Sequence, residues 1–234
     1  MADSDWYQLT RPSWPHSHVI LASHTAFALC LYTAVVHGHA LEAAGLTLSA
    51  AISVAYHICD ENFACAFGWP IATWHALDVW ATFFLVCFVL GVMVLDLPSR
   101  KARFAARAAY AALVTSFVWY DRGSMLLFGG LLLSVAVAVF FRYAVQRRHL
   151  AWGAAKRRAR LRYLITGLAI FSLSLGCFVV ANTSVIGPVT YDAARDGPVK
   201  PMAVPDTAVY YLFHSVWHAC SALSAHCIVK FKNG

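Results

Sequence analysis

Long apolar stretches, separated by short polar segments, run through almost the whole chain. A transmembrane helix needs about 20 mostly apolar residues. About seven stretches approach or exceed that length, with approximate limits at residues 17–37, 41–59, 71–95, 105–120, 124–146, 163–183 and 206–229. No heptad pattern, internal repeat or low-complexity linker interrupts them. The pattern predicts an all-α membrane protein, in which residues 1–234 form a single seven-helix transmembrane domain.

The composition agrees with a membrane protein and disfavours a soluble one. Hydrophobic residues make up 60% of the chain and charged residues 12%, and the mean hydropathy is +0.62. So few charges cannot cover the surface of a soluble domain. The net charge of +7 raises the question of nucleic-acid binding. However, twelve of the eighteen basic residues lie in two short segments between apolar stretches, so we expect no nucleic-acid partner.

Basic residues gather after the third and fifth apolar stretches and at the end of the chain. They are Arg100, Lys101, Arg103, Arg107, Arg142, Arg147, Arg148, Lys156, Arg157, Arg158, Arg160, Arg162, Lys230 and Lys232. In a seven-helix protein these segments share one side of the membrane, which the positive-inside rule makes cytoplasmic. We therefore expect an integral membrane protein of the plasma membrane or an endomembrane. Its N-terminus would be extracellular or lumenal and its C-terminus cytoplasmic.

Candidate metal-binding histidines occur in the last apolar stretch. His214 and His218 are four residues apart, so they lie one above the other on the same face of a helix. Two imidazoles in this arrangement can bind one metal ion from one side. The other ligands of such an ion must come from elsewhere in the fold.

Further polar residues are expected at the same depth in the membrane. Ser53 and His57 share a face of the second stretch, and Asp78 lies near the start of the third. With the orientation given above, all of them fall in the outer half of the membrane together with His214 and His218. Three histidine nitrogens and one water complete a hydrolytic zinc site. His57, His214 and His218 would hold the ion, with Asp78 as the base for the water and Ser53 as its hydrogen-bond partner.

Other histidines are assigned ordinary structural roles. A single histidine in a membrane helix more often forms a hydrogen bond between helices than binds a metal ion. This interpretation covers the remaining histidines of interest, which are His24, His37, His39, His75 and His226. Among them His75, beside Trp74 at the start of the third stretch, is the reserve candidate for a metal ligand.

Together these motifs resemble the myomaker and transmembrane-protein-eight branch of the CREST superfamily. The resemblance rests on Ser53-Val-Ala-Tyr-His57-Ile-Cys59-Asp60, Asp78, Tyr120-Asp121-Arg122 and His214-Ser-Val-Trp-His218, and it covers nearly the whole chain. The superfamily also includes alkaline ceramidases and adiponectin/progestin receptors. The resemblance implies zinc held by His57, His214 and His218, with Ser53 and Asp78 beside the zinc-bound water. It implies a hydrolase for lipid amides or esters, with a membrane lipid or fatty acid as partner.

Cys59 and Cys65 are predicted to form a disulfide. They flank the predicted outer loop between the second and third stretches, where the environment is oxidising. Members of the resembled family carry a similar pair with wider spacing. A disulfide here would hold the end of the helix that carries His57.

Two other functions compete with the hydrolase. The first is a non-catalytic membrane protein, either a fusion protein or a subunit of an oligomer or larger complex, with a structural zinc ion. Ser53 and Asp78 favour the enzyme, because a structural ion needs only its ligands. The second is a b-type haem protein. It is disfavoured because axial ligands approach a haem from opposite faces, whereas His214 and His218 share one helix face.

Overall fold

The computed structural model describes residues 14–60, 65–86, 92–95, 97, 99–120, 125–145, 151–183, 191–192, 197–198 and 207–233. Its helices, in chain order, are α2 (Trp14–Ser23), η1 (His24–Ala26), α3 (Phe27–Val36), α4 (Ala40–Asp60), η2 (Ala66–Gly68), α5 (Ile71–Phe83), α6 (Val92–Leu95), α7 (Arg100–Tyr120), α8 (Met125–Phe140), the π-helical η4 (Phe141–Val145), α9 (Ala154–Thr183) and α10 (Thr207–Asn233). Two strands of two residues each, β1 (Tyr191–Asp192) and β2 (Gly197–Pro198), pair antiparallel. The described residues are thus almost entirely helical, as predicted.

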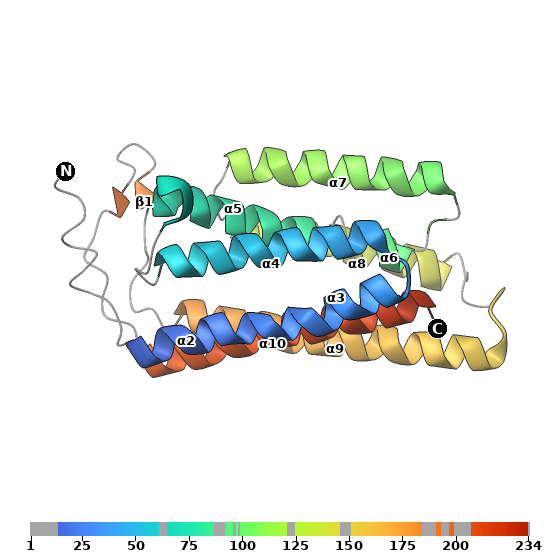
Figure 1. Ribbon diagram of the computed structural model, residues 1–234. Helices are drawn as coiled ribbons and strands as arrows, with labels where there is room; N and C mark the ends of the chain where they lie inside the picture. The colour runs from blue at the N-terminus through green and yellow to red at the C-terminus, as the bar shows by residue number, and fades with distance from the viewer. Residues whose placement is uncertain are drawn as a thin grey trace.

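The long helices lie side by side along one direction (Figure 1). Helix α10 contacts α9, α2 and α3, and α4 contacts both α3 and α5. Helix α7 packs on the far side of α5. The bundle therefore brings the second, third and last apolar stretches close to one another and to the first.

Three helical runs are long and apolar enough to cross a membrane, judged by length and composition. They are His18–Val36, Ala40–Asp60 and Ala154–Ala181. Apolar side chains such as Tyr32, Val35 and Val36 point outward and are 59–67% exposed, which suits contact with lipid. These features mark an integral membrane protein. The predicted count of seven spans, the single domain and the orientation stay predictions.

The helix boundaries differ from the predicted ones in two ways. Helix α9 begins at Ala154 rather than near residue 163, and α7 begins at Arg100 rather than near 105. Lys and Arg have high helix propensity, so the basic segments extend the helices beyond their apolar parts. The third stretch is divided, because α5 passes into a π-turn at residues 84–86 and α6 is a separate short helix.

A 3-10 turn shapes the first helical run. It occupies His24–Ala26, between α2 and α3, and its flanking residues keep helical backbone angles. The hydroxyl of Ser23 donates to the carbonyl of Ile20, and that of Thr25 to the carbonyl of Ala22. Side chains that bond to the preceding turn commonly bend or tighten a helix. The turn directs His24 into the bundle, where it is buried.

A close helix contact joins α9 to α10. A Cβ atom added at Gly167 would lie 3.1 Å from the Cβ of Cys227 and 3.4 Å from the carbonyl oxygen of Ser224. The hydroxyl of Ser224 donates to the carbonyl of Gly167 at 2.8 Å. Small residues at such interfaces let two membrane helices approach closely. This contact sets the position of α10, and with it the position of its histidines.

Candidate metal centre

The three predicted ligands meet in the interior of the bundle. His57 lies in the last turns of α4, and His214 and His218 lie on consecutive turns of α10. Nε2 of His57 is 3.3 Å from Nε2 of His214 and 3.2 Å from Nε2 of His218. His57 is fully buried, and the other two are buried as well. The structure thus places the three residues near one another, and their role as metal ligands stays a prediction.

Two separations at His57 match the spacing of nitrogens around one metal ion. A zinc–nitrogen bond of 2.0–2.1 Å with tetrahedral angles places two ligand nitrogens about 3.3 Å apart. Nε2 of His57 lies at about that distance from Nε2 of His214 and from Nε2 of His218. His214 and His218, however, do not belong to one group of ligand atoms that all lie within 4.8 Å of one another, so His214 would have to move to share an ion with the other two.

The outer ring nitrogens of two of these histidines have no hydrogen-bond partner among the described residues. They are Nδ1 of His57 and Nδ1 of His214, both buried. Metal-binding histidines usually donate this N–H to a carboxylate, a carbonyl or water. In this they differ from the fourth histidine of the cluster, whose Nδ1 has a partner.

His24 is this fourth histidine, and the sequence analysis missed it. One nitrogen each of His24, His57 and His218 lie within 4.8 Å of one another, so among the described residues it is these three that form a group able to hold a metal ion. The rings of His24 and His218 have centroids 4.1 Å apart. A signal was present in the sequence, because His24 lies about two turns into the first apolar stretch. It thus falls at the depth predicted for His57 and His214.

The hydrogen bonds of His24 fix which nitrogen faces the cluster. Nδ1 lies 2.9 Å from the carbonyl oxygen of Ile20. A carbonyl can only accept, so Nδ1 carries a proton and donates it. In the neutral ring Nε2 then keeps its lone pair, and it lies 3.1 Å from the hydroxyl of Ser53. This is the second-sphere arrangement that metal-binding histidines normally show.

Ser53 joins His24 to Asp78. Ser53 lies one turn before His57 on α4, and its hydroxyl forms a hydrogen bond with His24 and lies near the carboxyl group of Asp78. Asp78 lies on α5 and is buried. Its Oδ1 has no hydrogen-bond partner among the described residues. The predicted proximity of Ser53 and Asp78 to the histidines is therefore present.

Helix packing and one covalent bond hold these groups in place. The hydroxyl of Ser49, one turn before Ser53, donates to the carbonyl of Ala81 on α5 at 3.1 Å. Just after His57 in the chain, Cys59 forms a disulfide with Cys65, which confirms the predicted pair. The bond ties the end of α4 to the segment that leads into η2 and α5. It therefore limits the motion of the helix turn that carries His57.

The other histidines differ in their roles. His226 contacts the hydroxyl of Thr33 through Nδ1 at 3.0 Å, and His39 contacts Asn233 through Nε2 at 2.9 Å. The first is an interhelical hydrogen bond, as predicted, and the second joins the turn between α3 and α4 to the end of α10. His75, the reserve ligand, packs against the ring of Tyr56 and belongs to no potential metal group among the described residues. Asp121 and Arg122, which contributed to the resemblance, lie outside the described residues.

A small cavity adjoins the centre. It has a volume of about 60 Å³ and lies between α3, α4, α5, α9 and α10. Ser53 and His218 line it, together with apolar side chains such as Phe171 and Trp217. Hydroxyl groups of Ser174 and Ser221 in the same lining are 2.7 Å apart. The cavity offers an apolar space directly beside the histidine cluster.

The fold and the centre define an integral membrane protein with a buried cluster of four histidines, one serine and one aspartate. Comparison with protein-family models gives a match over residues 13–185 to the family described as protein of unknown function DUF3522. The chain therefore belongs to this family. The matched part contains His24, Ser53, His57 and Asp78, whereas α10 lies beyond it. A search of curated proteins gives no match.

Proposed function

We propose that the protein is a zinc-dependent intramembrane hydrolase that cleaves an amide or ester bond of a membrane lipid. The observation that carries this proposal is the position of Nε2 of His57, which lies 3.3 Å from Nε2 of His214 and 3.2 Å from Nε2 of His218, in a buried cluster of histidines of which three could hold a metal ion. A carboxylate and a hydroxyl lie next to them in the same buried site. The proposal agrees with the resemblance of these motifs to the CREST superfamily.

The donor atoms favour zinc. The site offers imidazole nitrogens and no thiolate, since the nearby Cys59 is oxidised in a disulfide. Imidazole suits zinc, copper, iron and nickel. Three histidines with a fourth open position are the arrangement of catalytic zinc. Bound zinc would supply a water of lowered pKa and would polarise the carbonyl of the lipid.

The remaining residues then have separate tasks. Oδ1 of Asp78 would accept a proton from the attacking water and return it to the leaving amine or alcohol. The hydroxyl of Ser53 would orient the water or donate to the developing oxyanion. His24 would hold Ser53 in place, because its own orientation is fixed by the carbonyl of Ile20.

Substrate access requires movement of side chains. The cavity of about 60 Å³ beside Ser53 and His218 has room for only a few water molecules, at roughly 10–15 Å³ each. Its lining of Phe171, Leu175 and Trp217 is suited to an acyl chain. We infer that the acyl chain enters between α9 and α10 as Trp217 moves aside. If the charge argument for the orientation holds, the carbonyl would arrive from the outer leaflet.

Replacement of Asp78 tests the hydrolase directly. Asp78→Asn should keep the fold and most of the zinc, because the imidazoles remain. It should lower hydrolysis by on the order of a hundredfold or more, since the amide cannot accept the proton. The measurement is fatty-acid release from ceramides, phospholipids and glycosylphosphatidylinositol lipids, with zinc content determined in both proteins. A wild-type protein that holds zinc and releases no fatty acid from any of them would contradict the proposal.

A structural zinc site is the second candidate, and His24 is the observation that favours it. If Nε2 of His24 turned from Ser53 to the ion, four nitrogens would close the site, and closed sites are typical of structural zinc. The protein would then be a non-catalytic fusion protein or a subunit of a membrane complex.

The variant His24→Ala separates the two candidates. In the hydrolase, cobalt(II) substituted for zinc should show the same visible absorption bands in wild type and variant, while the rate of hydrolysis falls. In the structural site, removal of a nitrogen ligand should change the cobalt bands and weaken metal binding. His226→Ala is the matched control, because His226 lies on α10 and contacts Thr33 rather than the cluster.

A further inference from the structure

An exposed aromatic loop, residues 65–70, lies between α4 and α5 and includes η2. All six of its residues are exposed. The side chain of Phe67 is 82% exposed and that of Trp69 is 45% exposed. Residues 65–77 contain no Asp, Glu, Lys or Arg. Exposed apolar surface of this kind is unfavourable in water and marks a place of contact with a protein, a ligand or a membrane.

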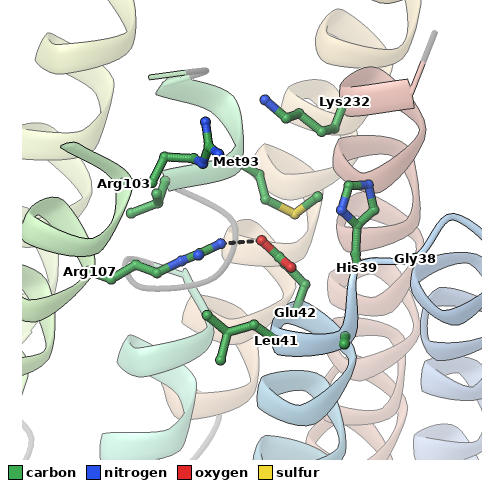
Figure 2. A pocket seen from close by; sticks show the side chains of 10 residues that line it. Gly38, His39, Leu41, Glu42, Met93, Arg103, Arg107 and Lys232 are labelled. Carbon is green, nitrogen blue, oxygen red and sulfur yellow. Dashed lines mark hydrogen bonds and ion pairs between the residues drawn. The ribbon is translucent and has the colours of Figure 1, made fainter. Parts of the chain in front are cut away.

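The opposite end of α4 has a different character. There Glu42 forms an ion pair with Arg107 of α7 (Figure 2). Both side chains line a cavity together with those of Arg103 and Lys232. The surface at the start of the helix is therefore charged, whereas the loop after its end is uncharged and aromatic. Charged side chains suit contact with water and lipid head groups, so it is the aromatic loop that calls for an apolar partner.

The disulfide fixes the level of the aromatic loop along the bundle. Cys59 lies in the last turn of α4, and the Cα of Cys65 is 4.3 Å from the Cα of Cys59. Phe67 follows two residues later, so its Cα lies within about 8 Å of the Cα of Cys65, at 3.8 Å per residue. Helix α4 is one of the helical runs that are long and apolar enough to cross a membrane. The aromatic loop therefore lies at the level where this run ends.

Contacts with α5 hold the rings of the aromatic loop in place. The ring centroids of Phe67 and Trp69 are 6.4 and 5.5 Å from that of Trp74, a buried residue of α5. Nε1 of Trp74 donates to the carbonyl of Ala66 at 3.3 Å. Phe67 has a φ of +58°, which bulky residues rarely adopt. Such conformations persist where the surrounding structure imposes them, often at functional sites. The loop therefore imposes the outward position of this ring.

The backbone of the aromatic loop forms hydrogen bonds within the loop. The N–H of Gly68 donates to the carbonyl of Cys65 at 3.2 Å, and the N–H of Trp69 donates to the carbonyl of Ala66 at 3.3 Å. Pro70 has no N–H to satisfy. Unpaired backbone groups are unfavourable away from water. These bonds therefore make it easier for the loop to lie against lipid.

We propose that the aromatic loop is a membrane anchor, which inserts among the lipid head groups of the leaflet nearest to the histidine cluster. Aromatic side chains concentrate at this boundary, where the ring meets the acyl chains and a polar edge such as the N–H of Trp69 meets water. Exposed apolar side chains at the same end of the bundle, Val19 of α2 and Leu212 of α10, make the loop part of a larger lipid-facing surface.

The anchor would hold the end of α4 at a fixed depth. Cys65 ties the aromatic loop to Cys59, and His57 lies two residues before Cys59 on the same helix. A loop fixed among the head groups therefore also fixes the depth of His57. The proposal does not depend on the chemistry of the histidine cluster, since it rests on the exposure and the position of the loop alone.

Photo-crosslinking in membranes tests the proposal. The photoreactive amino acid 4-benzoylphenylalanine would replace Phe67 in the full chain, which is reconstituted in phosphatidylcholine vesicles and illuminated. We expect a covalent adduct with phosphatidylcholine, measured by mass spectrometry of the intact protein, in severalfold higher yield than with the same replacement of Lys101. Lys101 is the matched control, because it is also exposed but belongs to the basic start of α7. Adducts only within the chain or with a second copy, no adduct, or equal lipid yields at the two positions would overturn the proposal.

The fluorescence of the natural tryptophans provides a second measurement that leaves Phe67 unchanged. The emission of Trp69 is the difference between wild type and Trp69→Phe, in vesicles whose phosphatidylcholine carries bromine near the head group or near the end of the acyl chain. We expect bromine near the head group to quench this emission more strongly. Trp74→Phe is the matched control, because the ring of Trp74 is 5% exposed and its emission should be quenched severalfold less. Emission of Trp69 that acrylamide in the water quenches and bromine does not would place the loop in water and contradict the anchor.

Discussion

Among single residues, His24 has the greatest effect on the interpretation of the centre. Its Nδ1 is committed to the carbonyl of Ile20 and its Nε2 to Ser53. In the proposed hydrolase the ring positions the hydroxyl of Ser53, whereas in the proposed structural site its Nε2 would become the fourth ligand. Rotation of this one side chain would therefore separate the two proposals.

Replacement of single side chains also leads to a prediction about the number of zinc ions bound per chain. We expect one zinc ion per chain, and His214→Ala combined with His218→Ala should strongly weaken zinc binding, because only His57 and His24 would remain in the cluster. Elemental analysis of protein purified in detergent measures this. His226→Ala, on the same helix, should retain the metal. Full zinc in the double variant would exclude α10 as the source of ligands.

At the scale of helices, the contact of α9 with α10 determines where the ligands lie. Gly167→Val should lower the free energy of unfolding by about 1–3 kcal/mol, because its side chain would collide with Cys227 and the backbone at Ser224. Gly176→Val on the same helix is the matched control. It carries the same change of helix propensity, but a Cβ there meets nothing within 4 Å.

Thermal unfolding in detergent, followed by circular dichroism, distinguishes the two glycine variants. Gly167→Val should melt at a lower temperature than Gly176→Val and should also lose zinc more readily, since a shift of α10 moves His214 and His218 away from His57. Equal melting temperatures would show that the interface adapts to a larger residue and that it does not set the position of the cluster.

For the molecule as a whole, the histidine cluster and the basic segments lie toward opposite ends of the bundle. The histidine cluster lies toward the end of α4 and the start of α10, whereas the basic start of α9 and the end of α10 lie at the other end. If the positive-inside rule applies, the basic end faces the cytoplasm and the histidine cluster the outer leaflet.

This orientation can be tested with terminal tags. We expect an N-terminal tag to be labelled in intact cells and a C-terminal tag only after permeabilisation. If the protein resides in an internal membrane, selective permeabilisation of the plasma membrane should expose the C-terminal tag alone. Labelling of the C-terminal tag in intact cells would reverse the assignment of both ends.

Local patterns in the sequence determined the helical class, the positions of most helices and five residues of the centre. Apolar length and spacing suffice for these, because a helix satisfies its own backbone hydrogen bonds and a spacing of four residues defines a face. Helices α7 and α9 start at Arg100 and Ala154, earlier in the chain than the apolar pattern predicts. The reason is that hydropathy detects the apolar part of a helix and not its basic extension.

Only the tertiary structure decided which residues far apart in the chain meet. His24 and Ser53 are 29 residues apart, and Glu42 and Arg107 are 65 residues apart. No local sequence pattern predicts either contact, because each depends on how two helices are rotated about their axes and on the distance between them. That geometry follows from side-chain packing over whole helices, such as the close approach at Gly167, and it cannot be derived from any one segment.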